Sequence, residues 1–207
     1  VVPGGVKRDL TPEKIKKIEN AVMKVSFAAS KLDGYMRKSP SETDRLETTG
    51  ILTKEYAENL GTVGVIARAS GIESDVRKEV PYDEYGNLSL NVITEKKGDC
   101  LARSTVRAHE ICESISLILQ CLTKIETGDI FTEPEIPRGM ACGIVESPRG
   151  ELLHCAEIID NEIWRYSIRD PSFVNWPALE VSVLKDIIPD FPLINKSFGL
   201  SYSGNDV

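Results

Sequence analysis

The stretch GDCLARSTVRAHEICESISLILQCLTKI, residues 98–125, predicts a long amphipathic helix. We expect Gly98-Asp99 to start this helix. Apolar residues recur behind it at three- and four-residue steps, and they share one stripe because about 100° separates successive helical residues. These residues are Ile111, Ile115, Ile118, Leu119, Leu122 and Ile125. We expect Thr127-Gly128 to end the helix.

A narrow stripe of charged residues lies beside the apolar stripe in the first half of this helix. It consists of Asp99, Arg103, Arg107 and Glu110. One interpretation is a solvated face whose i,i+4 pairs each contribute a few tenths of a kcal/mol. The other is a partly buried ion network. The residues alone favour the solvated face.

A second long helix is predicted upstream of this one. Thr11 is a good cap, and Pro12 suits the first helical position. Apolar residues then repeat with the helical period as far as Asp33-Gly34, where we expect the helix to close. Residues 39–42 contain a proline and are predicted to form a loop.

The segment between the two long helices is mostly irregular. Thr53 caps a short helix predicted over residues 53–60, which Gly61 and Gly64 end. Residues 68–98 show little periodicity. An irregular stretch of this length is usually functional or lies over another element.

The last third of the chain is predicted to be β-rich at first and helical afterwards. Residues 141–146, 151–159 and 162–169 alternate apolar and polar residues and are separated by turn sequences, so we predict a three-stranded antiparallel meander. A helix is expected over residues 171–184, and short mixed structure over residues 186–199. The class is therefore α+β, mainly helical, with two long packed helices and a small antiparallel sheet near the C-terminus.

Composition limits the possible partners. Of the 207 residues, 41% are hydrophobic and 28% are charged, as in an ordinary globular protein. The longest apolar stretches fall short of the roughly 18–20 residues that cross a bilayer. The net charge of −7 argues against a nucleic-acid partner and against direct binding to anionic lipid. We expect one domain over residues 1–207, as a fragment of a longer chain because no initiator methionine is present.

Five cysteines are scattered along the chain without a CxxC pair. They are Cys100, Cys112, Cys121, Cys142 and Cys155. An odd, scattered set in apolar segments is typical of reduced cytosolic thiols that pack as small hydrophobic residues. No signal peptide is recognised, and the spacing does not suit an iron–sulfur cluster.

Three segments resemble, in order, the large subunits of NiFe-hydrogenases and of respiratory complex I. Residues 69–85 resemble the G-S-G-I…D-L-R…P-Y…Y segment of complex I, and residues 98–110 resemble its G-D-x-x-x-R-x-x-V-R-x-x-E helix. Residues 145–154 resemble the E-A-P-R-G-x-L-x-H turn of hydrogenases, and the opening Pro3-Gly4-Gly5-Val6 also fits. The resemblance is greatest to the membrane-bound, energy-converting type, and it implies a hydrogenase large subunit-like fold over nearly the whole chain.

The end of the chain departs from the hydrogenase pattern. Mature hydrogenases end in a C-x-x-C motif whose thiolates hold nickel and iron. In residues 197–207, Ser201 and Gly204 stand at those cysteine positions. A serine hydroxyl is a much more basic ligand than a thiolate, and glycine has no side chain to offer. The resemblance therefore implies a version that binds no nickel–iron centre.

The resemblance also proposes three residues for a catalytic pocket. In hydrogenases the turn at Arg149 faces the iron ligands, so here Arg149 would line an empty or quinone-accessible cavity; the alternative is an arginine that points to solvent. His154 follows this turn, although a lone histidine, like His109, is more often a structural residue. Ser172 is either a hydroxyl donor to the pocket or a helix cap, with the cap slightly favoured.

The resemblance favours the ion-network interpretation of the charged stripe, because complex I places this helix towards its membrane arm. Asp75 and Arg77 are near enough to pair with each other or with the charged stripe, and Tyr82 and Tyr85 could order the same loop. We therefore expect a coupling network of Asp75, Arg77, Asp99, Arg103, Arg107 and Glu110.

The expected function is that of a subunit in a membrane-associated, hydrogenase-related or NADH-quinone oxidoreductase-like complex. It would bind no cofactor itself, shape a quinone-like acceptor cavity, and couple redox change to ion translocation. Electrons would come from iron–sulfur clusters on a partner. The partners implied are a small iron–sulfur subunit, the N-terminal part of the large subunit and membrane ion-translocating subunits, with the chain on the cytoplasmic, inner face of the cell membrane. The alternative is a structural scaffold without catalysis.

Overall fold

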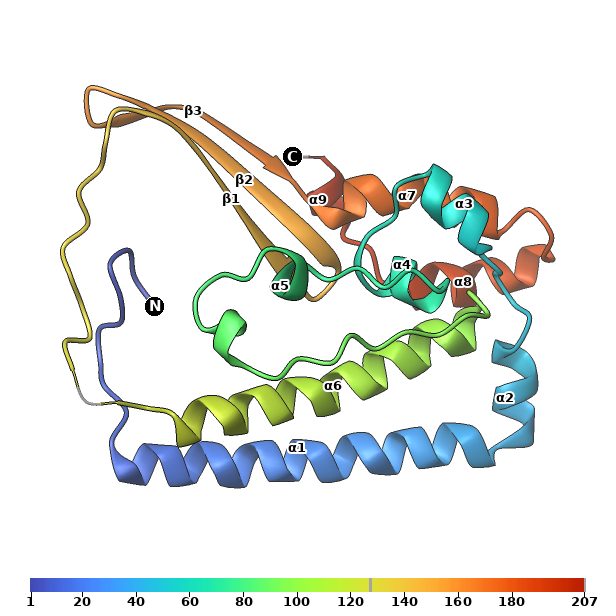
Figure 1. The fold of residues 1–207 in the computed structure, drawn as a ribbon. Coiled ribbons are helices and arrows are strands. Elements are labelled where there is room, and N and C mark those ends of the chain that lie inside the picture. The colour runs from blue at the N-terminus through green and yellow to red at the C-terminus, as the bar shows by residue number, and fades with distance from the viewer. Residues whose placement is uncertain (127, 207) are drawn as a thin grey trace.

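The computed structural model describes residues 1–126 and 128–206, without the side chains of Asp33, Met36 and Arg37. About half of these residues are helical, and a three-stranded antiparallel sheet leans over them (Figure 1). The α+β class is confirmed.

Helix α1 (Pro12–Lys38) begins as predicted, since Thr11 accepts a hydrogen bond from the backbone of Lys14. The predicted end at Asp33-Gly34 is wrong, because the helix continues for another turn to Lys38. A single glycine is tolerated inside a helix, and Pro40 supplies the stronger interruption. The predicted loop at residues 39–42 is also wrong. Pro40 occupies the first position of helix α2 (Pro40–Leu46) instead.

Helix α6 (Cys100–Thr123) starts after Gly98-Asp99 as predicted, and Asp99 caps it by accepting a 2.8 Å hydrogen bond from Ala102 N. It lies alongside α1 (Figure 1). It ends slightly earlier than predicted, and Thr127 of the expected terminator lies outside the described residues.

Three short helices and a 3₁₀ turn lie between α2 and α6. Thr53 caps α3 (Lys54–Asn59) as predicted. Gly64 does not end that helix but begins α4 (Gly64–Ala69). Its φ is +66°, and a Cβ there would lie 2.2 Å from the carbonyl oxygen of Arg149, so this backbone packs directly against the β1–β2 turn. Helix α5 (Val76–Glu79) and the 3₁₀ turn η1 (Tyr85–Asn87) interrupt the segment that was predicted to be irregular.

The sheet is the predicted meander, with order β1-β2-β3. Its strands are β1 (Gly139–Ser147), β2 (Gly150–Ile159) and β3 (Glu162–Arg169). The tight turn between β1 and β2 points at the helical body, and we call this the inner end of the sheet (Figure 1).

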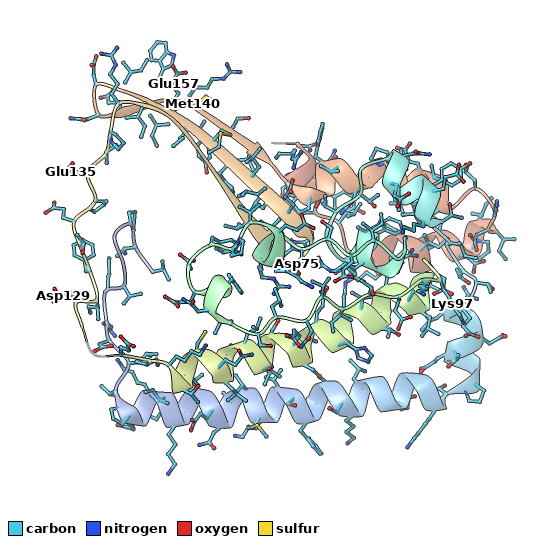
Figure 2. The ribbon with its side chains drawn as sticks, viewed as in Figure 1. Asp75, Lys97, Asp129, Glu135, Met140 and Glu157 are labelled. Carbon is cyan, nitrogen blue, oxygen red and sulfur yellow. A yellow bond between two sulfur atoms is a disulfide. The ribbon has the colours of Figure 1, made fainter. Side chains whose placement is uncertain are left out.

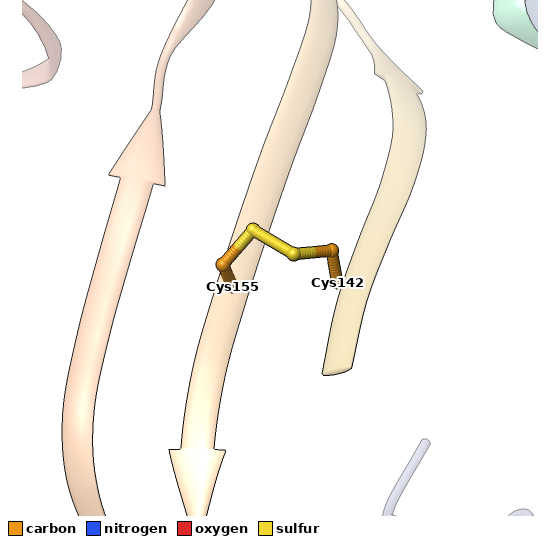
Figure 3. The surroundings of a disulfide bond; sticks show 2 residues. All are labelled: Cys142 and Cys155. Atoms are coloured by element: carbon orange, nitrogen blue, oxygen red, sulfur yellow. A yellow bond between two sulfur atoms is a disulfide. The ribbon is translucent and has the colours of Figure 1, made fainter. Parts of the chain in front are cut away.

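The cysteine prediction is wrong. Cys142 and Cys155 are opposite each other in the β1–β2 register and form a disulfide (Figure 3). Cys112 and Cys121 are exposed, and only Cys100 is a buried thiol. Spacing along the chain did not indicate the bridge, because strand pairing brings the two cysteines together from 13 residues apart.

The chain ends in helices that close the core. These are α7 (Pro171–Ser182), the 3₁₀ turn η2 (Ile188–Asp190), α8 (Phe191–Phe198) and α9 (Tyr202–Asn205). Ile194 and Phe198 of α8 pack with Leu52, Ile66 and Leu179 in the main apolar cluster. Within the described part of the chain, none of the helices combines the length and apolar character needed to cross a bilayer.

A substitution at Gly98 tests how closely the backbone before α6 packs against Leu52. Its φ is +65°, a Cβ would lie 2.0 Å from Leu52 O, and its own N–H donates to Ala69 O. We expect Gly98→Ala to lower the free energy of unfolding by about 2 kcal/mol or more, measured by urea denaturation. Gly34→Ala is the matched control. It lies within α1 with open space around it, so it should raise stability by about 0.5–1 kcal/mol. Equal effects of the two substitutions would contradict this packing.

Candidate functional site

A buried arginine, Arg68 of α4, joins four elements at the inner end of the sheet. Its side chain is 2% exposed and lies 2.7 Å from Glu110 of α6, 2.9 Å from Glu146 of β1 and 3.6 Å from Asp75 beside α5. It also donates to Ser74 O. Burial opposes its charge, but the surrounding carboxylates outweigh burial and raise the pKa of Arg68. One cation thus connects three carboxylates that are far apart in sequence.

Asp75 and Arg77 form the second pair of this cluster. Arg77 contacts both carboxylate oxygens of Asp75, at 2.9 and 2.6 Å, and Asp75 lies where the sheet meets the helices (Figure 2). Burial works to raise the pKa of Asp75, but Arg77 and then Arg68 lower it overall. Arg77 also lies 5.9 Å from the Tyr85 ring. The two residues therefore pair with each other and reach the charged stripe through Arg68 and Glu110.

Glu146 lies near the end of β1, and its side chain is 5% exposed. Its carboxylate accepts hydrogen bonds from Arg68 and from Val76 N, and its own backbone N–H donates to Tyr82 Oη. Burial, followed by repulsion from Asp75, raises the pKa of Glu146 in spite of Arg68. Sequence reasoning singled out neither Arg68 nor Glu146. The available signal was that Arg68 directly precedes the segment of residues 69–85 and that Glu146 lies within the 145–154 motif.

The first turns of α6 are buried, so the solvated interpretation of the charged stripe is wrong. Asp99 is 1% exposed and Arg103 is 0% exposed. Arg103 donates to Gly98 O at 2.7 Å, Gly50 O at 2.9 Å and Ser197 Oγ at 2.9 Å. Burial lowers the pKa of Arg103. These two residues therefore brace loops and the C-terminal segment, whereas Glu110 belongs to the Arg68 cluster.

Arg107 lies between these two groups. Its guanidinium donates to Phe198 O at 2.8 Å. Burial, with repulsion from Arg103 and Arg149, lowers the pKa of Arg107 to about 10, although Glu110 acts in the opposite direction.

A cavity of about 560 Å³ adjoins the Arg68 cluster between α1, α6 and the β1–β2 turn. We call it the α1–α6 cavity. One side is apolar, from Val22, Val25, Ile111, Ile115 and Ile118. The other side is charged, from Arg68, Arg77, Arg107, Glu110 and Glu146. This combination of size, apolar wall and convergent polar groups is typical of a small-molecule site.

The three residues proposed for a catalytic pocket do not gather in one place. Arg149 is in the β1–β2 turn, where its Nε donates to Gly199 O at 2.6 Å. His154 contacts the Tyr166 hydroxyl across the sheet. Ser172 is fully buried, and its hydroxyl accepts from Ser201 N at 3.0 Å. Arg149 and Ser172 thus both hold the C-terminal segment, and His154 belongs to a different contact.

The cap interpretation of Ser172 is wrong. Asp170 caps α7 by accepting a 2.7 Å hydrogen bond from Ser172 N. Ser172 occupies the second helical position, which leaves its hydroxyl available for the backbone of Ser201.

The C-terminal residues do not fit a nickel–iron centre. Ser201 caps α9, since its hydroxyl accepts from Gly204 N at 3.1 Å. A Cβ at Gly204 would lie 2.6 Å from Asp170 Cγ, so the Asp170 carboxylate fills the space of a side chain there. Across residues 1–126 and 128–206, no group of three or more His, Cys, Asp or Glu side chains is arranged to hold a metal.

Comparison with known proteins gives consistent matches. The family model for the respiratory-chain NADH dehydrogenase 49 kDa subunit matches residues 1–135. One subunit of the F(420)H(2) dehydrogenase of Methanosarcina mazei is 38% identical over 82% of this chain and 45% of its own length. Formate hydrogenlyase subunit 5 of Escherichia coli is 29% identical over 98% of this chain and 36% of its own length.

A solved structure is also similar over the entire chain. The structure of the membrane-bound sulfane sulfur reductase, an archaeal respiratory membrane complex, contains a chain that matches with a TM-score of 0.90 and 27% identity. The match covers 100% of this chain and 59% of that chain. The present chain spans 34–60% of the length of the curated relatives it matches.

The Asp75 pair predicts a pH dependence of stability. The pKa of Asp75 is lowered from 3.8 in the folded state, so its stabilising contribution is full above that value and is lost as pH falls through the folded pKa. We expect Asp75→Asn to cost about 3 kcal/mol at neutral pH, because the buried Arg68 and the partly buried Arg77 both lose a partner. The difference from wild type should shrink on acidification below 3.8, measured by urea unfolding. The exposed Glu73→Gln serves as control, and a constant Asp75→Asn difference at all pH values would contradict the assignment.

Proposed function

Because this chain belongs to the family of the respiratory-chain NADH dehydrogenase 49 kDa subunit, we propose that it is part of a membrane-associated redox complex. Its relatives include subunits of F(420)H(2) dehydrogenase, formate hydrogenlyase and NADH-quinone oxidoreductase. Residues 1–207 form one domain within a longer large subunit in this proposal. The partners are the rest of that subunit, a small iron–sulfur subunit and membrane ion-translocating subunits, at the cytoplasmic face of the membrane.

The geometry of the C-terminal segment carries the proposal of a metal-free role. Ser201 is used as a helix cap, and Asp170 occupies the side-chain space at Gly204. Both positions thus have structural partners where a hydrogenase needs thiolates. The subunit itself performs no hydrogen chemistry in this proposal, and electrons arrive from iron–sulfur clusters on a partner.

The α1–α6 cavity is the proposed acceptor space. Its apolar wall suits a ring or chain, and its charged wall suits oxygen atoms, as a quinone-like molecule requires. A second candidate acceptor is sulfane sulfur, because the similar solved complex is a sulfane sulfur reductase and the likeness covers this whole chain. Turnover of the intact complex with quinone analogues and with polysulfide, compared side by side, distinguishes the two acceptors.

The Arg68 cluster supports a coupling role. Through Arg68 it connects Glu146 and Glu110, which both line the cavity, to Asp75 by ion pairs of 2.7–3.6 Å. Buried ion pairs are a weak source of stability compared with apolar packing, so a pure scaffold has little reason to contain this cluster. A change of charge in the cavity would alter the ion pairs and the position of α6 relative to its membrane partners.

Elemental analysis tests the metal-free role. The subunit isolated from the intact complex should contain no stoichiometric nickel, because neither Ser201 nor Gly204 can supply a thiolate. The measurement is mass spectrometry of the metal content, with an active NiFe-hydrogenase large subunit as the positive control. Nickel at one equivalent per subunit would reject the proposal.

Glu110→Gln tests the coupling role. It removes one carboxylate from Arg68 while keeping the side-chain shape, so we expect fewer ions translocated per electron in vesicles that contain the intact complex. If the Glu110–Arg68 pair contributes about 1.4 kcal/mol to one conformational state, its loss shifts the equilibrium between the two states about tenfold, and the ion-to-electron ratio should fall measurably. Glu113→Gln is the matched control, since Glu113 lies on the same helix but bonds Asn91 at the surface. If both variants keep the wild-type ratio, the cluster does not couple the two processes.

A further inference from the structure

The apolar side of the α1–α6 cavity leaves hydrophobic surface uncovered. Val25 of α1 and Ile111 of α6 line it, and they are 51% and 39% exposed. Two neighbouring helices thus present branched apolar side chains to one space of about 560 Å³. An apolar ring or short chain of a ligand would cover this surface.

The positive charges on most of the charged side are already paired with carboxylates. Arg68 contacts Glu110, Glu146 and Asp75, and Arg77 contacts Asp75. Two guanidinium groups therefore face three carboxylates. An anion entering this part of the cavity would be repelled rather than held.

Arg107 is the exception on the cavity wall. Its hydrogen bonds go to the neutral carbonyls of Phe198 and Arg103, at 2.8 and 3.5 Å. Among the side chains that the structure describes, no carboxylate lies within ion-pair distance of it. Arg103 and Arg149 repel its charge and Glu110 attracts it, but Arg107 is the lining arginine that has no carboxylate in direct contact among the described side chains.

We propose that the α1–α6 cavity binds an amphipathic monoanion, with Arg107 as its counter-charge. The apolar part of the ligand lies against Val25 and Ile111, and a planar pair of oxygens, as in a carboxylate or an enolate, meets the guanidinium. A single negative charge suits the site because only one cation on the wall is uncompensated. This inference rests on the proposed acceptor role of the cavity and names the charge of its ligand.

Two isosteric probes test the inference on the intact complex: a naphthalene carboxylate and the corresponding neutral carboxamide. Their affinities are measured by calorimetry. The carboxylate should bind about tenfold more tightly or better, as expected for a charge-assisted hydrogen bond in a partly buried site. Arg107→Gln should abolish this preference, and Arg107→Lys should restore part of it.

A second pair of variants leaves Arg107 and its contact with Phe198 in place. Ile111 lies one turn after Arg107 on α6, so Ile111→Glu supplies an internal carboxylate at i+4. It should remove the preference for the charged probe, whereas Ile111→Gln should weaken the binding of both probes alike, because Ile111 is part of the apolar wall, and should keep the preference. Because Ile111 is partly exposed, this pair also serves if the Arg107→Gln complex fails to assemble.

Equal binding of the two probes to the wild type would overturn the inference, and so would a preference for the carboxylate that survives Arg107→Gln or Ile111→Glu. A third contrary result is that neither probe binds because another segment fills the cavity. The assay involves no electron transfer, so it separates this inference from the proposed function. A retained preference for the carboxylate without turnover on quinone or polysulfide would reject the acceptor role alone. Turnover without the preference would reject the anion site alone.

Discussion

The ion pairs of Arg68 are the constraint on which the rest of the site depends. A guanidinium that is 2% exposed cannot remain charged without partners, and its partners come from α6, β1 and the loop before α5. This requirement fixes the inner end of the sheet against the helices. It also places charged groups along one wall of the α1–α6 cavity, whose other wall is the apolar surface between the two long helices.

Sequence patterns predicted the elements better than their contacts. The caps at Thr11 and Thr53 are local hydrogen bonds within a few residues, and both occur as predicted, as does the start of α6 at Gly98-Asp99. The three strands follow from alternation and turn sequences. Arg68 could not be predicted as the centre of the cluster, because its partners lie up to 78 residues away. The disulfide was missed for the same reason, since it depends on strand register.

Helical periodicity alone wrongly predicted that the charged stripe of α6 is solvated. Asp99, Arg103, Arg107 and Glu110 share a helix face, and such a face is usually solvated. Here the face meets loop carbonyls, the C-terminal segment and Arg68, so two of the four residues are fully buried. The alternative of a partly buried ion network agrees with the burial of Asp99 and Arg103. It did not separate these two residues, which contact loops and the C-terminal segment, from Arg107 and Glu110, which line the cavity.

The β1–β2 hairpin is held by two kinds of bond at different points along its length. Its inner end depends on Glu146 and on the close approach of Gly64 to the turn. Further along, a sulfur–sulfur bond joins the same two strands. The hairpin is therefore secured by two bonds of different chemistry: an ion pair at its root, which protonation of the carboxylate would break, and a covalent bond in its outer half, which only reduction would break.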